Sequence, residues 1–188
     1  MKRSAMVLAS ALFFLLTVVA GAYAVEITAD MVTKEGKVTR NGKMYVKGNK
    51  YRVEKGSSPM FVIVRGDKNK FWQVNSAERT YIEAALTPDM RPNVEEKLNG
   101  ETARKAMGTE TINGYAAKKS QVTVKGPKGK AETVTQWFST EYSFPVKLAG
   151  EKWTVEYKNI KKGSVPDSMF ELTKGLVIDT TEVPDVLH

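Results

Sequence analysis

Histidine and cysteine carry much of the chemistry that proteins perform near neutral pH, and this sequence offers almost none of either. It contains no cysteine, and its single histidine is the last residue, His188. Catalytic triads and Cys–His dyads need an imidazole beside a nucleophile, and transition-metal sites need several imidazoles or thiolates together. The sequence therefore predicts no catalytic centre of these classes, no metal site and no cofactor.

Carboxylates are the acid–base groups that remain, because a glycosidase needs only two of them at the right separation. On a half-exposed sheet, acidic residues more often pair with lysine and arginine across strands. The glycine-bearing run at 126–130 lacks the spacing of a phosphate loop and is interpreted as a turn. A glycosidase-like enzyme that uses a pair of carboxylates is thus a weaker hypothesis than the two binding functions given below. The acids concerned are Glu26, Asp30, Glu54, Glu83, Glu132, Glu141 and Glu156.

Large, adaptable apolar side chains are the more informative feature. Methionine adjusts its shape, so a wall of methionine and aromatic residues on the concave side of a sheet could hold acyl chains. Burial of each CH₂ is worth about 0.8 kcal/mol. The same residues could equally fill an ordinary core. They are Met31, Met44, Met60, Met90, Met107, Met169, Phe61, Trp72, Phe138 and Trp153.

The elements that must position these residues read as strands joined by hairpins. Turn chemistry recurs along the chain, as in Asn-Gly at 41–42 and again at 113–114. Between the turns, alternation is clearest at Trp153, Val155 and Tyr157, which places apolar residues on one face and polar residues on the other. About eleven strands are predicted, at 26–35, 37–47, 50–55, 60–65, 70–75, 79–84, 108–113, 115–125, 130–139, 145–149 and 151–159.

Two segments depart from simple alternation. The run Met60-Phe61-Val62-Ile63-Val64 is apolar throughout, which predicts a mid-sheet strand covered on both faces. Residues 89–107 carry helix signals, with short helices predicted at 94–98 and 101–107. Lying between two groups of strands, this segment is expected to cover one side of a curved sheet.

The N-terminus has the three parts of a secretory signal peptide. Lys2 and Arg3 precede an apolar run from Ala5 to Ala20, and Ala22-Tyr23-Ala24 supply the small-x-small signal for the expected cleavage after Ala24. An uncleaved anchor is the alternative. No later apolar run is long enough to cross a membrane, so no transmembrane segment is expected after cleavage. We therefore expect a periplasmic protein with one domain at 25–175 and an extended tail at 176–188.

The net charge of +8, or +6 without Lys2 and Arg3, favours anionic partners. For an exported protein these are phospholipid headgroups, lipopolysaccharide or acidic polysaccharide. No nucleic-acid-binding motif is present, and the lysines are spread along the chain, so nucleic acid is not expected. A basic surface that serves only solubility is the simpler interpretation.

A resemblance to a known family rests on particular segments. The first half carries ITADMV at 27–32, GKMYVK at 42–47, KYRVE at 50–54, VRGD at 64–67 with Trp72, and YIE at 81–83. The second half carries GTETINGY at 108–115, FPVK at 144–147 and PDSMFEL at 166–172. Together they resemble a domain-of-unknown-function family of exported bacterial proteins, which is similar to the outer-membrane lipoprotein carrier (LolA-like) superfamily.

This resemblance implies a strongly curved, incomplete antiparallel barrel with helices over an apolar hollow. It also implies a binder or chaperone of lipidated or hydrophobic cargo, and no reaction. Two features depart from the carriers. The first strand starts almost at the cleavage site, with no helix before it, and Gly48 stands where the carriers have an arginine. The same half-barrel also serves periplasmic stress-sensing regulators, so the fold does not fix the function.

The sequence therefore predicts a mainly β half-barrel that binds lipid, lipoprotein acyl chains or another hydrophobic cargo in the periplasm. The alternative is an envelope module that binds a protein or an anionic polysaccharide through its sheet edge or basic surface. The residues predicted to line the hollow are Met44, Val46, Phe61, Ile63, Trp72, Val155 and Tyr157.

Overall fold

A single curved sheet makes up most of the structure, which is a computed structural model describing residues 25–126 and 129–180. Its strands are β1 (Glu26–Glu35), β2 (Val38–Lys47), β3 (Lys50–Glu54), β4 (Met60–Arg65), β5 (Lys70–Asn75), β6 (Thr80–Ala85), β7 (Glu101–Ile112), β8 (Tyr115–Lys125), β9 (Ala131–Ser139), β10 (Phe144–Ala149), β11 (Trp153–Lys162) and β12 (Val177–Ile178). The predicted signal peptide lies outside the described residues.

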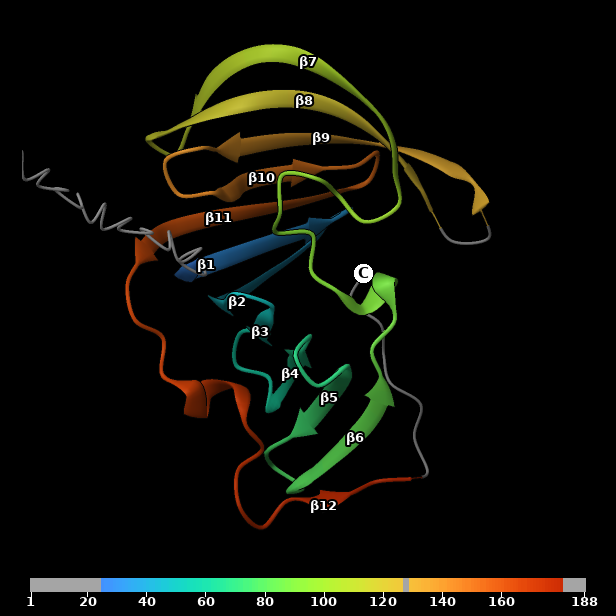
Figure 1. Cartoon of the computed structure of the whole chain (residues 1–188), viewed down its shortest axis with the longest axis vertical. Helices are drawn as coiled ribbons and strands as arrows, with labels where there is room; N and C mark the ends of the chain where they lie inside the picture. The colour runs from blue at the N-terminus through green and yellow to red at the C-terminus, as the bar shows by residue number, and fades with distance from the viewer. Residues whose placement is uncertain (1–24, 127–128, 181–188) are drawn as a thin grey trace, which may run out of the picture.

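The strand order is β12-β6-β5-β4-β3-β2-β1-β11-β10-β9-β8-β7. Neighbouring strands are antiparallel except β12, which pairs parallel with β6. The chain thus runs through two meanders, β1 to β6 and β7 to β11, and the pairing of β1 with β11 joins them. Figure 1 shows how the joined sheet curls over on itself without closing. The predicted curved antiparallel half-barrel is confirmed, with a twelfth strand in the expected tail.

Strand positions follow the turn chemistry closely, with one instructive exception. Asn113 and Gly114 have φ of 51° and 84° and turn the β7–β8 hairpin, as predicted. Gly42, by contrast, lies inside β2 rather than in a turn. A Cβ there would lie 2.3 Å from the Glu54 carbonyl oxygen, so glycine allows β3 to approach closely. The turn between β1 and β2 instead uses Gly36, whose φ is 55°.

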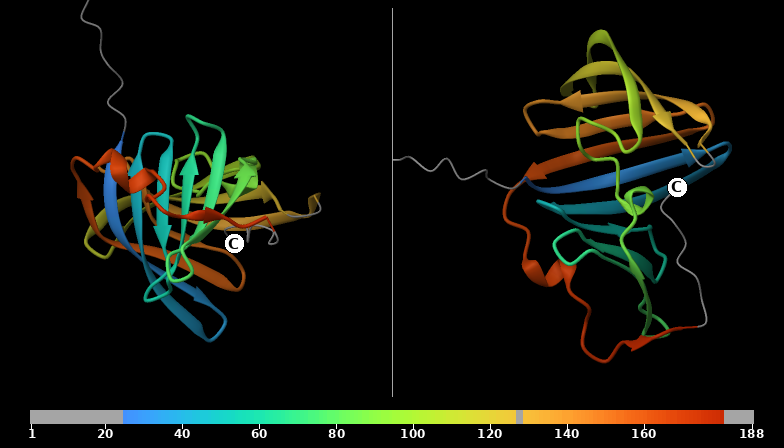
Figure 2. Two further views of the ribbon diagram at one scale, coloured as in Figure 1. Left: turned by 90° about the horizontal axis from the view of Figure 1, so that it is seen from below. Right: turned by 45° about the vertical axis from the view of Figure 1, so that its right-hand side comes forward.

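The helices predicted at 94–98 and 101–107 are wrong. The described residues contain no α-helix, and residues 101–107 begin the long strand β7. Residues 86–100 form an irregular connection whose regular part is the short 3-10 helix η1 (Pro88–Met90). This connection crosses the concave side of the sheet, so the expectation that it covers one side is met without a helix (Figures 1 and 2).

A second segment covers the outer side of the sheet. Residues 163–176, which we call the strap, run from β11 to β12 across the outer face and include the 3-10 helix η3 (Asp167–Phe170) (Figure 2). The sheet is therefore buried on both faces along its middle. This explains the fully apolar β4, in which Val62 and Val64 face one side and Phe61 and Ile63 the other.

Candidate functional site

The concave face of the sheet carries a continuous apolar surface, which we call the concave wall. Seven strands contribute to it, because alternate residues of each strand point inward. Its members are Ile27, Ala29, Met44, Val46, Tyr51, Val53, Val62, Val64, Phe71, Phe144, Val146, Tyr157 and Ile160. Phe144 and Tyr157 pack edge to face with their ring centroids 4.9 Å apart. Burial raises the pKa of Tyr157 far above its usual range.

The connection 86–100 lies on this wall and excludes water from it. Leu86 and Val94 are buried against the wall, and Met90 of η1 packs beside them. Leu98 is buried in an adjoining patch with Val122, Val134 and Leu148. Met44 in the middle of the wall is only 2% exposed. The predicted hollow is therefore occupied by the chain's own side chains, and we call residues 86–100 the cover.

Gln136 is the polar group that attaches the cover to the sheet. It is fully buried on β9, and its side-chain nitrogen donates a hydrogen bond of 2.9 Å to the carbonyl oxygen of Glu95. Its side-chain oxygen accepts one of 2.9 Å from Arg104 Nη1. A buried amide that satisfies both its donor and its acceptor in this way fixes the geometry around it.

Arg104 on β7 completes this attachment. It donates to the carbonyl oxygen of Glu96 in the cover and forms an ion pair of 2.7 Å with Glu101. The guanidinium holds the pKa of the Glu101 carboxyl below its usual range. Glu101 also accepts a hydrogen bond of 2.9 Å from the backbone nitrogen of Leu98. The C-terminal half of the cover is therefore attached by a few polar contacts.

The structure divides the seven predicted wall residues between the two faces. Met44, Val46 and Tyr157 are buried in the concave wall, and the half-buried Val155 packs against it. The other three, Phe61, Ile63 and Trp72, belong to a separate cluster on the outer face, so their placement on the same wall is corrected. Because β4 and β5 are apolar on both faces, alternation could not show which residues point inward. The cross-strand pairs Tyr51–Val64 and Val53–Val62 do indicate the inward residues of β4. Cross-strand partners share a face, and β3 alternates clearly.

The strap fills the outer cluster with apolar side chains. Val165 and Phe170 are buried there with Ile63, Trp72 and Val74. Trp72 also donates a hydrogen bond of 2.8 Å from its ring nitrogen to Glu83. The outer face of β4 and β5 is therefore an internal packing surface, and its aromatic residues are covered.

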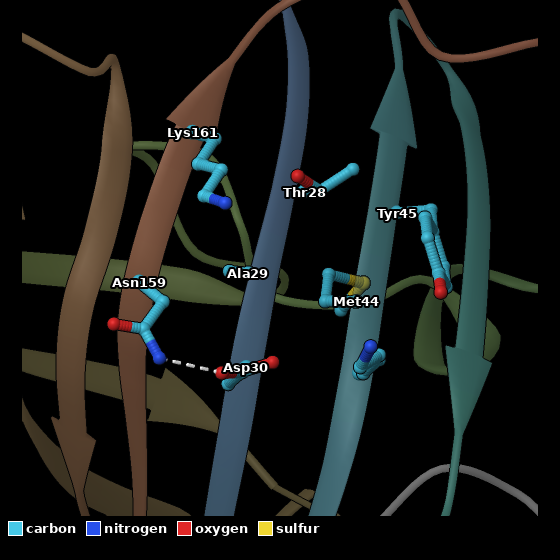
Figure 3. Close-up of a pocket in the computed structure, with 8 residues that line it drawn as sticks. Thr28, Ala29, Asp30, Met44, Tyr45, Asn159 and Lys161 are labelled. Carbon is cyan, nitrogen blue, oxygen red and sulfur yellow. Dashed lines mark hydrogen bonds between the residues drawn. The ribbon is translucent and has the colours of Figure 1, made fainter.

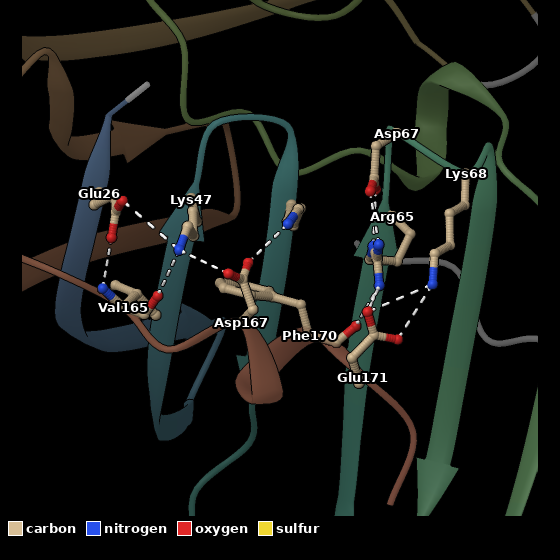
Figure 4. Close-up of polar contacts among 10 residues, drawn as sticks. Glu26, Lys47, Arg65, Asp67, Lys68, Val165, Asp167, Phe170 and Glu171 are labelled. Carbon is tan, nitrogen blue, oxygen red and sulfur yellow. Dashed lines mark hydrogen bonds and ion pairs between the residues drawn. The ribbon is translucent and has the colours of Figure 1, made fainter. Parts of the chain in front are cut away.

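Charged residues fasten the strap at both of its ends (Figure 4). At the first end, Asp167 forms ion pairs of 3.2 Å with Lys47 and 2.8 Å with Lys50. These lysines lower the pKa of the Asp167 carboxyl. Glu26 accepts a hydrogen bond of 2.6 Å from the backbone nitrogen of Val165.

At the second end, the buried guanidinium of Arg65 binds three partners. It pairs with Asp67 at 2.6 Å, with Glu171, and with the carbonyl oxygen of Phe170 at 3.1 Å. The hydrogen bonds from Arg65 lower the pKa of Asp67 to about 2. Burial alone would raise the pKa of Glu171, but hydrogen bonds from Arg65 and Lys68 hold it below its usual range.

Two open pockets in the described part of the chain lie on the outer face, between β11, β1 and β2. They have volumes of about 370 and 480 Å³ and are open to solvent. Asp30 and Glu54 both line the larger one, so two of the seven candidate carboxylates share a pocket. Each already accepts a hydrogen bond, Asp30 from Asn159 at 2.7 Å and Glu54 from Arg52 at 2.8 Å.

Residues 25–126 and 129–180 contain no cluster of three or more histidine, cysteine or acidic side chains that could hold a metal ion. No helix in these ranges is long and apolar enough to span a membrane. His188, the single histidine, lies outside them.

Comparison with known proteins gives a family and a fold. Residues 26–142 match a family described as "Domain of unknown function (DUF4412)". No curated protein matches the sequence. Among solved structures, MucB matches at 11% identity with a TM-score of 0.53, over 81% of this chain and 58% of that chain. The Pseudomonas aeruginosa MucA/MucB complex matches at 13% identity with a TM-score of 0.52, over 77% of this chain and 54% of that chain.

A LolA superfamily protein from Nitrosomonas europaea also matches, at 11% identity with a TM-score of 0.39, over 78% of this chain and 89% of that chain. The chain spans a little over half the length of the MucB chains. At these identities the likeness describes the fold.

Proposed function

Because this chain belongs to the family described as a domain of unknown function, DUF4412, we propose its function from its own geometry. We propose that it is an exported, non-enzymatic protein that binds lipid, lipoprotein acyl chains or other hydrophobic cargo on its concave wall. The observation that carries this proposal is the pairing of a continuous apolar wall with a non-helical cover, which Gln136 and Arg104 of the sheet bind through its backbone carbonyls. Cargo binds when the cover moves away and the acyl chain takes its place.

The free energy lost when the cover leaves the wall is comparable with the free energy gained when an acyl chain is buried there. Leu86, Met90 and Val94 lie on the wall, and full burial of such side chains is worth about 1.5–3 kcal/mol each. An acyl chain of about ten methylenes gains roughly 8 kcal/mol at about 0.8 kcal/mol per CH₂. Chains of about that length or longer can therefore replace the cover, whereas short ones cannot. We expect affinity to rise with acyl chain length and to be weak below about eight carbons.

The test is native mass spectrometry of the protein purified from the periplasm, combined with titration of a fluorescent acyl probe. We expect co-purified lipid, or probe uptake that fatty acids of twelve or more carbons displace. A probe that binds equally well in the presence of long and short fatty acids would contradict cargo exchange at the wall. Absence of both co-purified lipid and probe uptake would sink the proposal.

A second function, binding of a protein partner, is favoured by the open edge of β7. This twelve-residue strand pairs only with β8, and its residues 102–111 are exposed. At the opposite edge, the short strand β12 pairs with Thr80 and Tyr81 of β6. A long unpaired edge offers backbone donors and acceptors to an extended peptide.

Proline substitutions separate this second function from the first. Successive residues of a strand direct their N–H groups to opposite sides, so one of Lys105 and Ala106 directs its N–H outward. Lys105→Pro and Ala106→Pro would each be compared with the native protein by circular dichroism and by pull-down from envelope extract. We expect the variant that keeps the fold to lose a stoichiometric partner while still taking up the acyl probe. Retention of the partner by that folded variant would exclude pairing at this edge.

A further inference from the structure

The outer face carries a polar trough that the proposed function does not use. It consists of the two open pockets between β11, β1 and β2, which share Asp30, Lys43 and Asn159 as lining residues. Lys161 lines the smaller pocket and Lys158 the larger one. Figure 3 shows the smaller pocket, with Lys161 and Asn159 of β11 reaching toward Thr28 and Asp30 of β1. We call this surface the outer trough.

The lysines of the trough differ from their neighbours on the same face. Lys47 has a carboxylate at 3.2 Å and Lys147 has one at 3.0 Å. Among the described residues, no carboxylate forms an ion pair within 4.0 Å of Lys43, Lys158 or Lys161. Lys43 lines both pockets, and Lys161 and Lys158 line one pocket each, so the outer trough is bordered by three lysines without ion-pair partners.

Asp30 reduces this positive charge only in part. It lies opposite Lys43 on β2 and opposite Lys158 on β11, so one carboxylate stands between two lysines. Its Oδ2 accepts the hydrogen bond from the Asn159 amide. The other acid of the trough, Glu54, forms an ion pair of 2.8 Å with Arg52. The trough thus keeps a net positive charge of about two, which favours an anionic ligand.

A β-bulge gathers these groups on one face. The pairing of β1 with β11 shifts between Thr28 and Asp30, so that Lys161 lies opposite Thr28 and Lys158 opposite Asp30. One extra residue is thereby accommodated in β11, where Asn159 has a φ of 49°. Tyr157 and Ile160 still point into the core. Lys158, Asn159 and Lys161 consequently all line the trough, which regular alternation would not allow.

We propose that the outer trough binds a phosphate group. A phosphate monoester carries a charge of about −1.5 to −2 near pH 7 and three acceptor oxygens. As a ligand it therefore matches several lysine donors better than a carboxylate ligand would. The hydroxyl of Thr28 lies in the same pocket as a further donor. The trough is on the opposite side of the sheet from the concave wall, so this site is independent of the proposed acyl cargo.

The test is an NMR titration of the full mature protein with inorganic phosphate. We expect saturable shifts of the backbone amides of residues 28–30, 43–45 and 158–161. The double variant Lys158→Gln/Lys161→Gln should weaken the apparent affinity by about tenfold, since charge-assisted contacts are lost. The matched control is Lys37→Gln/Lys152→Gln, which removes the same charge from exposed residues outside the trough. Shifts that do not saturate, or an equal weakening in the control, would overturn the proposal.

Two further arms identify the source of the phosphate. Glycerol 3-phosphate represents a soluble ester, and vesicles containing phosphatidylglycerol represent a lipid headgroup, with phosphatidylcholine vesicles as the reference. Sedimentation with phosphatidylglycerol vesicles that inorganic phosphate inhibits supports a headgroup site. Binding of glycerol 3-phosphate without sedimentation supports a soluble ester. Binding of neither, or sedimentation that the double variant retains, would again overturn the proposal.

Discussion

At the scale of single residues, Gln136 links the sheet to the cover. Its amide satisfies a backbone carbonyl of the cover on one side and Arg104 of β7 on the other. Sequence alone gave no reason to single out this residue among the polar residues of the strands. Its importance comes from burial, because a buried amide must have hydrogen-bond partners and thereby fixes the position of the cover against the sheet.

Gln136→Ala removes this link without removing any apolar contact of the wall. We expect the cover to open more readily, so that the acyl probe enters faster, while the free energy of unfolding falls by about 1–2 kcal/mol. Stopped-flow fluorescence measures the first effect and denaturant titration the second. Gln121→Ala, at an exposed position of β8, is the matched control. Unchanged entry in Gln136→Ala would show that the cover does not limit access.

Arg65 and its carboxylates make the strap sensitive to acid. The pKa of Asp67 is about 2 in the folded protein, below the ordinary aspartate value of 3.8, because Arg65 donates hydrogen bonds to its carboxylate. A carboxyl group with a lowered folded-state pKa stabilises the fold above its unfolded value and loses that effect as pH falls through the folded value. Asp67 therefore stabilises the fold fully above about pH 4 and progressively less toward pH 2.

Asp67→Asn should lower the free energy of unfolding at neutral pH and flatten its dependence on pH between about 4 and 2. Urea titrations across this range measure both effects. Glu78→Gln, in an exposed turn, serves as the control and should leave the pH dependence as it is in the native protein. An Asp67→Asn profile that is parallel to the native one would contradict this role for the ion pair.

At the scale of elements, sequence reasoning located the strands of both meanders but mistook the start of β7 for a helix. Residues 101–107 hold good helix formers such as Ala103, Lys105 and Met107, and Glu101 and Arg104 have the spacing of a helical ion pair. Pairing with β8 overrides this local preference over the whole strand. Local propensity is a weak prior when a neighbouring strand supplies a complete set of backbone partners.

The strap was equally hard to foresee, because its apolar residues form no periodic pattern. The motif PDSMFEL at 166–172 contributes to the family resemblance, but only the tertiary contacts show that it packs on the outer face of β4 and β5. The same contacts explain why Phe61, Ile63 and Trp72 were assigned to the wrong side. An apolar strand indicates that both faces are covered but not which segment covers each.

Phe170 is the strap residue on which this packing depends most. It is fully buried, and Phe170→Ala should lower the free energy of unfolding by about 3–5 kcal/mol. Thermal and chemical denaturation measure the loss. Met169→Ala, at the half-buried neighbouring position, should cost clearly less. Equal losses in the two variants would mean that the strap does not depend on Phe170 for its packing against β4 and β5.

At the scale of the whole molecule, the sheet is held together at one seam. The pairing of β1 with β11 joins the two meanders, and it involves residues separated by more than a hundred positions. A chain ending at Gly150 would lack β11, so β1 and β10 would each keep a neighbour on one side only. We expect such a chain to aggregate in size-exclusion chromatography, whereas a chain ending at Gly175 should remain monodisperse. A monodisperse shorter chain would show that the meanders hold together without the seam.

The position of this seam also has a consequence for biogenesis. Under the export proposed above, the polypeptide would emerge from a translocation channel N-terminus first and expose β1 long before β11. During that interval β1 has a neighbour on one side only, and its free side can pair with other emerging chains. On that proposal the native structure could be completed only after almost the entire polypeptide had crossed, and a holding chaperone on the far side would protect β1 until then.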